Sequence, residues 1–534
     1  MRSAACARAL SLPICLGLLA AACGGGSAGP PPPKADFALV ITPEATFAVT
    51  GNTTAPVVLS VAPQNGFSDS VTVTLQGVPQ GVTVSPSSPF VLAAGQTRSL
   101  AFTVPAMAPV GIASITVLAT SGALSHGAQL TLTTRAQPAV RTYQDGSVLY
   151  LESSSGSDTA RIGLETKWGG SIVEVSLNGV NFVNAHDTGR EVQPAFREGK
   201  DLNWNPTLGG DVYDQGTAII AYMVSPDALS TQAQPLQWSP DFYGGGAGRP
   251  VPGDMLVEQT ITAVTSQLNT FKVHYKATHL GRDLHANGIQ ELPAVYTNQD
   301  YSRFARYEDT SPWTYGATTA TQFPILGTDG PLVYVPEHWG ALVNGQTLGL
   351  TGFAPSNYPY AQGFMAPDPG AGGPTDNATN YFILQSYLTI APGYVFEWDV
   401  YLIPGDYRDA RQIIYWLHET QGAPDIFTAT GATDSPSTGS TISGVTTVAG
   451  WAFDDLDVSK TEVLVDGAVD GTASYGATRP DIPAVFPHAP ASVGFSYPLD
   501  TTKYPNAAHT LNVRVTDSSG NVAVFADVPV TVSN

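Results

Sequence analysis

The sequence has little cysteine and little charge. Only three of its 534 residues are cysteines, and two of them, Cys6 and Cys15, fall in an apolar N-terminal segment. Beyond that segment Cys23 is the single thiol, which excludes a disulfide framework, a cysteine-ligated metal and a cysteine nucleophile. Charged residues make up 13% of the chain, and the formal net charge is −21. Nucleic acids and anionic membrane surfaces need clustered Lys and Arg, so we expect neither as a partner.

Motifs for nucleotides, metals and serine nucleophiles are also missing. There is no Walker A loop, no dinucleotide-binding glycine loop, no HExxH zinc motif and no GxSxG elbow. The run 244–249 is rich in glycine but is followed by Pro250, which favours a flexible loop. His274 and His279 are five residues apart, one in an expected strand and one at its end, so the spacing does not make them converge. The sequence therefore predicts no cofactor and no metal site.

The N-terminus has the pattern of a secretory signal. Arg2 and Arg8 precede an apolar run, 9–22, that is too short to cross a bilayer as a helix. The run ends in Leu-Ala-Ala-Ala-Cys-Gly, with the cysteine at Cys23, and this resembles a bacterial lipoprotein signal. An ordinary signal peptide cleaved near Ala22 is the alternative.

The lipoprotein resemblance implies a specific N-terminal organisation. Residues 1–22 would be the signal peptide, and Cys23 would be lipidated. Residues 23–35, rich in Gly and Pro, would then be a tether. The implied location is the outer membrane or cell surface, with membrane contact through the lipid anchor only.

The rest of the chain consists of short alternating apolar runs separated by turn residues, which predicts an all-β protein. We expect a β-sandwich over 36–137, a large central β-domain over 138–424 and a further sandwich over 425–534. The one good helix candidate is 407–419, which follows a possible N-cap at Asp406.

Five segments carry family resemblances. Val-Pro-Gln-Gly-Val-Thr-Val at 78–84, and the series from Gly450-Trp-Ala-Phe-Asp to His509-Thr-Leu-Asn-Val, resemble bacterial Ig-like domains. In the centre, 168–179, 337–352 and 396–402 are similar in pattern and order to galactose mutarotase-like domains, which occur in aldose epimerases, glycoside hydrolases and polysaccharide lyases. The resemblance implies a large double-sheet supersandwich flanked by two Ig-like sandwiches.

One stretch, 178–216, stands out for its polarity. Nine of the 28 residues from Asp187 to Asp214 are charged, with amides and aromatics among them. Sugars offer hydroxyls and apolar C–H faces, so their sites combine carboxylates, amides, Arg and aromatic platforms. Similar mixtures occur around 285–296, 303–313 and 336–339. We therefore expect ligand contacts from the following residues: Asp187, Arg190, Gln193, Asn205, Asp211, Trp204, Trp313 and Trp339.

Three residues are candidates for proton transfer. Glu291 comes first, as general acid or base, because burial in its strand-like context would raise its pKa. His338 and Tyr296 follow. A structural carboxylate at Glu291 and a packed histidine at His338 are the alternatives. The expected function is binding and processing of a polysaccharide or oligosaccharide outside the cytoplasm, by hydrolase, lyase or epimerase chemistry. The alternative is a non-catalytic carbohydrate-binding or adhesion lipoprotein.

Overall fold

The computed structural model describes the chain from residue 33 to its end with short gaps. The described residues are 33–198, 203–309, 311–322, 332–366, 375–422, 425, 428–454 and 457–534. The expected signal peptide, Cys23 and most of the expected tether lie outside these residues. The protein is all-β: strands β1 to β40 account for most of the described chain, and α1 (Tyr407–Gln421) is the longest helix in it. Within the same residues no helix is long and apolar enough to cross a membrane.

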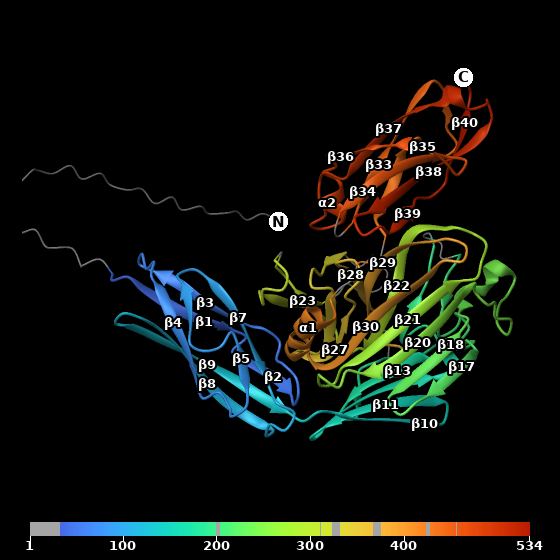
Figure 1. Cartoon of the computed structure of the whole chain (residues 1–534). Helices are drawn as coiled ribbons and strands as arrows, with labels where there is room; N and C mark the ends of the chain where they lie inside the picture. Colours follow the sequence, from blue (N-terminus) through green and yellow to red (C-terminus); the bar gives the residue numbers. More distant parts are fainter. Residues whose placement is uncertain are drawn as a thin grey trace, which may run out of the picture.

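Figure 1 shows three β-rich bodies that follow one another along the chain. The first is a sandwich of two sheets around a core that includes Phe37, Leu59, Phe102 and Leu132. One sheet has the order β1 (Asp36–Thr42), β3 (Val57–Gln64), β7 (Thr97–Thr103), β5 (Thr83–Ser85). The other has the order β2 (Ala45–Val49), β9 (Leu124–Arg135), β8 (Gly111–Ser121), β4 (Ser70–Gln76), β6 (Phe90–Ala93).

The central body contains two much larger sheets. A 12-stranded sheet has the order β10 (Ala139–Asp145), β11 (Val148–Ser155), β12 (Asp158–Glu165), β13 (Ser171–Leu177), β15 (Val192–Ala195), β22 (His285–Asn298), β29 (Thr379–Ile390), β28 (Tyr360–Ala366), β25 (Val333–Tyr334), with β14 (Val180–Asn181), β16 (Pro206–Thr207) and β19 (Leu236–Gln237) at its side. A 9-stranded sheet has the order β17 (Ile219–Val224), β18 (Ala228–Ala233), β20 (Met255–Ala263), β21 (Phe271–His279), β30 (Val395–Asp406), β27 (Leu348–Phe353), β26 (Trp339–Val343), β23 (Arg303–Tyr307), β24 (Thr318–Gln322).

The two large sheets enclose one core, to which strands of both contribute. β21 alternates strictly between buried and partly exposed residues, as expected for a strand with one face toward the core and one toward water. β29 is buried at every position, so its sheet is covered on both faces. Phe382 and Leu384 of β29 point into the main core, whereas Tyr381 and Ile383 belong to a small separate cluster with Ala294. The 12-stranded sheet therefore has a second covered face.

Helix α1 confirms the helix expected at 407–419. Asp406 caps it by accepting a hydrogen bond from the backbone N–H of Arg408. Ile413, Ile414 and Leu417 pack against the 9-stranded sheet. The helix also buries a charge, since Arg411 forms an ion pair with Glu337 at 2.9 Å.

The C-terminal body is another two-sheet sandwich, drawn in orange and red at the upper right of Figure 1. Its sheets have the orders β31 (Thr430–Ser435), β33 (Val445–Phe453), β37 (Gly494–Asp500), β36 (Ser474–Ala477), and β32 (Thr441–Ile442), β40 (Val528–Val532), β38 (Ala508–Asp517), β34 (Val458–Val465), β35 (Ala468–Thr472), with β39 (Val522–Val524) beside β38. Phe453 and Val493 extend the core of the central body. The hydroxyl of Tyr358 donates a hydrogen bond to Asp454 across the junction. The C-terminal sandwich is thus packed onto the central one.

Candidate functional site

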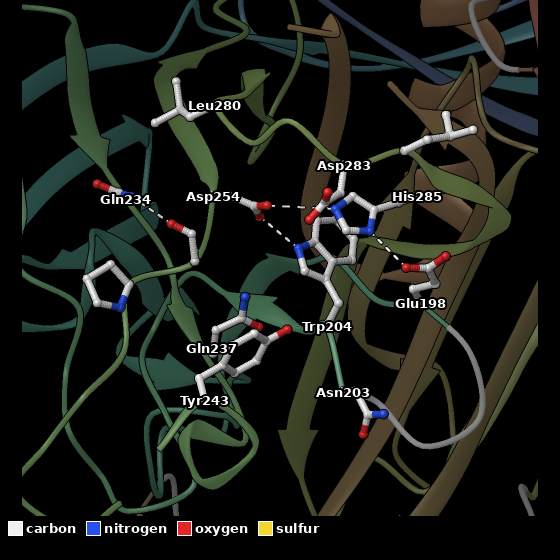
Figure 2. A pocket seen from close by; sticks show the side chains of 13 residues that line it. Glu198, Asn203, Trp204, Gln234, Gln237, Tyr243, Asp254, Leu280, Asp283 and His285 are labelled. Carbon is white, nitrogen blue, oxygen red and sulfur yellow. Dashed lines mark hydrogen bonds and ion pairs between the residues drawn. The ribbon is translucent and has the colours of Figure 1, made fainter. Parts of the chain in front are cut away.

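The central body has a large polar cavity beside the ends of β20 and β21. Its volume is about 770 Å³. It is lined by carboxylates, amides, aromatic rings and aliphatic side chains: Glu198, Asn203, Trp204, Gln234, Gln237, Tyr243, Pro252, Gly253, Asp254, Leu280, Asp283, Leu284 and His285. Figure 2 shows these side chains converging from several loops.

His285, the first residue of β22, lies at the centre of the cavity wall. Its Nδ1 lies 2.8 Å from Oε2 of Glu198, and its Nε2 lies 3.7 Å from Oδ2 of Asp254. The ring stacks on Trp204 with 3.6 Å between centroids. The indole N–H of Trp204 donates to Oδ1 of Asp254 at 2.7 Å, and Nε2 of His279 lies 3.2 Å from Oδ2 of the same carboxylate. Figure 2 shows Asp254 to one side of the stacked rings of Trp204 and His285, in contact with both, and Glu198 on the opposite side of the histidine ring.

Three ionisable groups of the cavity wall, Asp254, Glu198 and His285, are held in their charged forms. Burial by itself would lower the pKa of His285, but the nearby carboxylates of Asp254 and Glu198 outweigh it and raise the pKa to about 9. Burial opposes ionisation of Asp254 as well, yet the contacts of its carboxylate with His285, Trp204 and His279 bring its pKa well below the usual value. The hydrogen bond from His285 likewise lowers the pKa of Glu198.

A second cluster lies on the covered face of the 12-stranded sheet, and we call it the Glu291 face. Residues directly opposite each other in neighbouring strands share a face. Ala195, Glu291 and Gln385 are opposite one another across β15, β22 and β29, and Tyr296 is opposite Tyr381. Two phenols and one carboxylate therefore lie along one side of the sheet.

The Glu291 carboxylate has two polar neighbours. Oε1 lies 3.4 Å from Nη1 of Arg197, and the hydroxyl of Tyr381 donates a hydrogen bond to the carboxylate. The rings of Tyr296 and Tyr381 lie 4.6 Å apart. Burial, followed by the charge of Glu291, raises the pKa of both tyrosines well above 10. Both phenols are thus held protonated beside the carboxylate.

A buried acid lies at the border of this face. Burial, followed by the charge of Asp187, raises the pKa of Glu191 well above its usual value. Glu191 is fully buried, and its Oε2 accepts a hydrogen bond from Gln193 at 2.7 Å. The loop that carries it also supplies Asp187 and Arg190, which form an ion pair at 3.2 Å. Arg190 donates in addition to the backbone carbonyl of Asn377.

Neighbouring residues in the sequence contribute to the cavity and to the Glu291 face. Arg197 and Glu198 are consecutive residues, and their side chains go to Glu291 and to His285 respectively. Strand β22 carries His285 at its start and Glu291 six residues later. One strand and one short segment therefore position both clusters.

Among the expected proton-transfer residues, the structure brings Glu291 and Tyr296 together. Asp187 and Arg190 lie close enough to Tyr296 for their charges to influence its pKa. His338 lies elsewhere, just before β26 in the opposite sheet, and burial lowers its pKa to about 4. The structure therefore places His338 apart from Glu291, in surroundings that favour its neutral form.

Gln193 and Asp211, two of the expected ligand contacts, form hydrogen bonds within the polar loop. Gln193 is 1% exposed, and its amide bonds to the carbonyl of Thr188, the carboxylate of Glu191 and the N–H of Gly209. Asp211 is also 1% exposed and accepts from the backbone N–H groups of Tyr213 and Gln215. The same short polar side chains that suit a sugar suit a long ordered loop, and here the loop uses them.

The remaining expected ligand contacts lie in different parts of the structure. Asn205 is 9% exposed and is not among the side chains that line the cavity. Trp339 is fully buried and donates its indole N–H to Glu337. Trp313 stacks on His418 of α1, away from both clusters. Trp204 does line the cavity, but His285 covers one face of its ring.

The sequence pattern does not identify Asp254, Glu198 or His285 as site residues, and the spacing of His279 from His274 predicts no metal site there. The signal for Asp254 and His279 is the hairpin β20–β21, in which Met255 pairs with His279. Asp254 immediately precedes β20 and His279 is the last residue of β21, so this register brings the two residues close together. His274, which was considered together with His279, instead lies 2.9 Å from Asp399 on the outer face of the sheet.

The C-terminal body has a recognisable sequence family. The model for a bacterial Ig domain matches residues 430–513. No curated protein sequence matches the chain.

Solved structures of carbohydrate-active enzymes are among the structural neighbours. An endo-β-1,4-mannanase from Thermotoga petrophila is 20% identical over 24% of each chain, with a TM-score of 0.16. A polysaccharide lyase is 10% identical over 71% of this chain and 47% of its own, with a TM-score of 0.28. A cycloalternan-forming enzyme from Listeria monocytogenes, in complex with a pentasaccharide substrate, is 12% identical over 76% of this chain and 33% of its own, with a TM-score of 0.21. The chain spans less than half the length of each neighbour. The part of the chain with a shown relationship is its C-terminal Ig-like domain, which is similar to the bacterial Ig domain over residues 430–513.

Proposed function

We propose that the central body binds a glycan in the cavity and processes it by proton transfer at the Glu291 face. The observation that carries the proposal is the composition of the cavity wall. Charged carboxylates, amides and aromatic rings surround a space of about 770 Å³, which is within the usual size of a ligand site. Such a wall offers hydrogen bonds to sugar hydroxyls and apolar contact to sugar C–H faces.

The proton-transfer step is assigned to the Glu291 face because it brings a carboxyl group and two phenols together. Glu291 is the carboxyl group, and Arg197 beside it fixes its position. Tyr296 and Tyr381 are phenols held protonated by burial, which suits them to donate a proton. A carboxyl group and two phenols on one sheet face could supply the base and the acid that glycan elimination or epimerisation by acid–base catalysis needs.

The N-terminus supports an extracytoplasmic setting for this activity. We propose that the chain is a lipoprotein anchored through Cys23 and that residues 23–35 are a tether. The resemblance of the central sequence to galactose mutarotase-like domains agrees with glycan chemistry. The anchor is tested by metabolic labelling with a fatty acid, which Cys23→Ser should abolish.

A non-catalytic glycan-binding protein is the second candidate. The observation that favours it is the burial of the Glu291 face, where Tyr381 is 6% exposed. In that case the cavity alone would carry the function, and the acid–base cluster would stabilise the sheet.

The experiment is a panel of polysaccharides assayed at the same time for binding, new reducing ends and unsaturated products. We expect at least one glycan to be bound and converted. Glu291→Gln should abolish conversion and retain binding. The matched control is Glu174→Gln, because Glu174 is paired with Arg161 at 2.7 Å and its side chain is 14% exposed against 15% for Glu291. Binding without any product would leave the second candidate, and neither binding nor product would contradict both.

A further inference from the structure

We propose that Asp254, His279 and His285 form a binding site for a divalent first-row transition metal ion, with zinc as the preferred ion, in the wall of the cavity. The proposal is independent of the glycan function. Each of the three residues offers one ligand atom, and these atoms all lie within 4.8 Å of one another. Two imidazoles and one carboxylate are a common ligand set of zinc.

The separations of the ligand atoms fit a single small ion. Oδ2 of Asp254 lies 3.2 Å from Nε2 of His279 and 3.7 Å from Nε2 of His285. Around a tetrahedral zinc ion with bonds of about 2.1 Å, neighbouring ligand atoms are about 3.4 Å apart. The site is therefore close to its bound dimensions.

Both histidines are oriented for metal binding by their other nitrogen. Nδ1 of His279 lies 2.9 Å from the carbonyl oxygen of Ala391, which can only accept, so Nδ1 carries the proton. Nδ1 of His285 lies 2.8 Å from the carboxylate of Glu198. Binding of the ion would displace the Nε2 proton of each ring, and the lone pair left on Nε2 would face Asp254. Such carbonyl and carboxylate partners are typical of metal-binding histidines.

The site also contains a buried nitrogen without a hydrogen bond. Nε2 of His285 has no partner within 3.5 Å, its nearest carboxylate oxygen, Oδ2 of Asp254, lies 3.7 Å away, and the residue is 6% exposed. Leaving a buried ring nitrogen unpaired costs free energy, and a cation would supply the missing contact. The cation would take the place of the Nε2 protons that face the carboxylate of Asp254.

The surrounding chain leaves room for these atoms to approach. Trp204 engages Oδ1 of Asp254 and leaves Oδ2 for the ion. A Cβ added to Gly281 would lie 2.4 Å from Oδ2 of Asp254 and 2.5 Å from Nε2 of His279. A glycine is thus required next to the ligand atoms, and even alanine would displace them.

The burial of the ligands indicates where a fourth ligand would bind. The side chains of His279 and His285 are 0% and 8% exposed, whereas that of Asp254 is 30% exposed. Asp254 lines the cavity, so the open position would face it. Water or an oxygen of a bound molecule is the fourth ligand that this arrangement admits.

The test uses untagged protein stripped with a chelator and then loaded separately with Zn²⁺ and Co²⁺. We expect one tightly bound ion per chain, a melting temperature several degrees higher with metal, and the absorption bands of tetrahedral Co²⁺. His279→Gln and His285→Gln should lose the ion. His274→Gln is the matched control, since His274 is on the same strand as His279 with 43% of its side chain exposed, and it should bind as the parent does.

Several results would overturn the site. One is a parent protein that neither retains metal nor melts at a higher temperature with it, a measurement that needs no variant to fold. Another is metal binding that survives Gly281→Ala together with His279→Gln. A third concerns Asp425, Asp454 and Asp517, whose carboxylates also lie within 4.8 Å of one another. If Asp517→Asn removes the zinc and His279→Gln does not, the ion is bound there instead.

Discussion

The cavity and the Glu291 face differ in how burial acts on their ionisable groups. In the cavity wall, Asp254 and Glu198 have lowered pKa values and His285 has a raised one, so all three are charged. On the Glu291 face, Tyr296 and Tyr381 have pKa values well above 10 and are neutral. Strand β22 contributes residues to both regions, yet burial is offset by charged partners in the first and keeps the phenols neutral in the second.

The difference between the two regions shows that the charge of the neighbouring groups decides whether burial neutralises an ionisable group. Burial alone favours the neutral form of any group. In the cavity wall, oppositely charged partners within hydrogen-bond distance reverse that preference, as Glu198 does for His285 at 2.8 Å. On the Glu291 face the main charged neighbour of the tyrosines is an anion, which adds to the effect of burial. Charged groups suit ligand or metal binding, and neutral acids suit proton donation.

The largest effect that separates the two regions is expected from Tyr381→Phe. Loss of the phenol removes a proton donor beside Glu291, and kcat should fall by about 10²-fold or more. The affinity for the glycan should stay the same, because the cavity is unchanged. Steady-state kinetics and equilibrium binding on one glycan check this. Tyr387→Phe is the control, because Tyr387 is on the same strand but packs toward the C-terminal domain. Equal losses in both variants would contradict the assignment.

The next effect concerns stability. Gln193→Ala should lower the free energy of unfolding by about 1–3 kcal/mol, since it leaves buried groups of the polar loop unpaired. Gln234 is the counterpart in the cavity wall, where its amide donates to the carbonyl of Gly253 at 2.6 Å and water can replace it. Gln234→Ala should cost less than about 1 kcal/mol. Chemical denaturation measures both, and a reversed order would show that the loop does not depend on Gln193.

A smaller effect is expected on binding. Tyr243 lines the cavity with 47% of the residue exposed. Tyr243→Ala should weaken glycan binding by about tenfold, equivalent to about 1.4 kcal/mol, and leave kcat unchanged. The neighbouring Phe242 is 60% exposed and does not line the cavity, so Phe242→Ala should bind normally. Titration calorimetry distinguishes the two, and parallel losses would place the ligand elsewhere.

The smallest effect at any one pH is expected from Glu191→Gln. The pKa of Glu191 is raised in the folded protein, so the carboxyl stabilises the fold below its unfolded pKa, and this contribution is lost as the pH rises toward the folded pKa. The variant cannot ionise and should lose less stability than the parent between pH 5 and pH 9, a range that lies above the unfolded pKa of about 4.3. Melting temperatures across that range measure the slope. Identical slopes would show that Glu191 is ionised in the folded protein.

Part of this organisation follows from the sequence. The spacing of Ile413, Ile414 and Leu417 after Asp406 predicts α1, because capping and a 3.6-residue period are local properties. Glu291 and Tyr296 fall in one strand-like run, but regular alternation would put them on opposite faces, and a β-bulge between Glu291 and Ala294 brings them to the same one. The all-β class does follow from alternation.

The rest depends on long-range pairing. Asp254 and His279 adjoin only through the register of β20 and β21, and His285 reaches them only after a further turn. The hydrogen-bond partner of a polar residue also depends on long-range structure. Gln193 and Asp211 are residue types that suit a ligand site, but they accept hydrogen bonds from Gly209 and Gln215 instead. Composition alone does not distinguish a polar loop that binds itself from one that binds a ligand.

The central claim is that binding belongs to the cavity and chemistry to the Glu291 face. It is tested most directly by kcat and KM of Glu291→Gln and Tyr243→Ala on the same glycan. We predict that the first variant loses kcat with little change in KM and that the second raises KM with little change in kcat. Full turnover by Glu291→Gln would contradict the account.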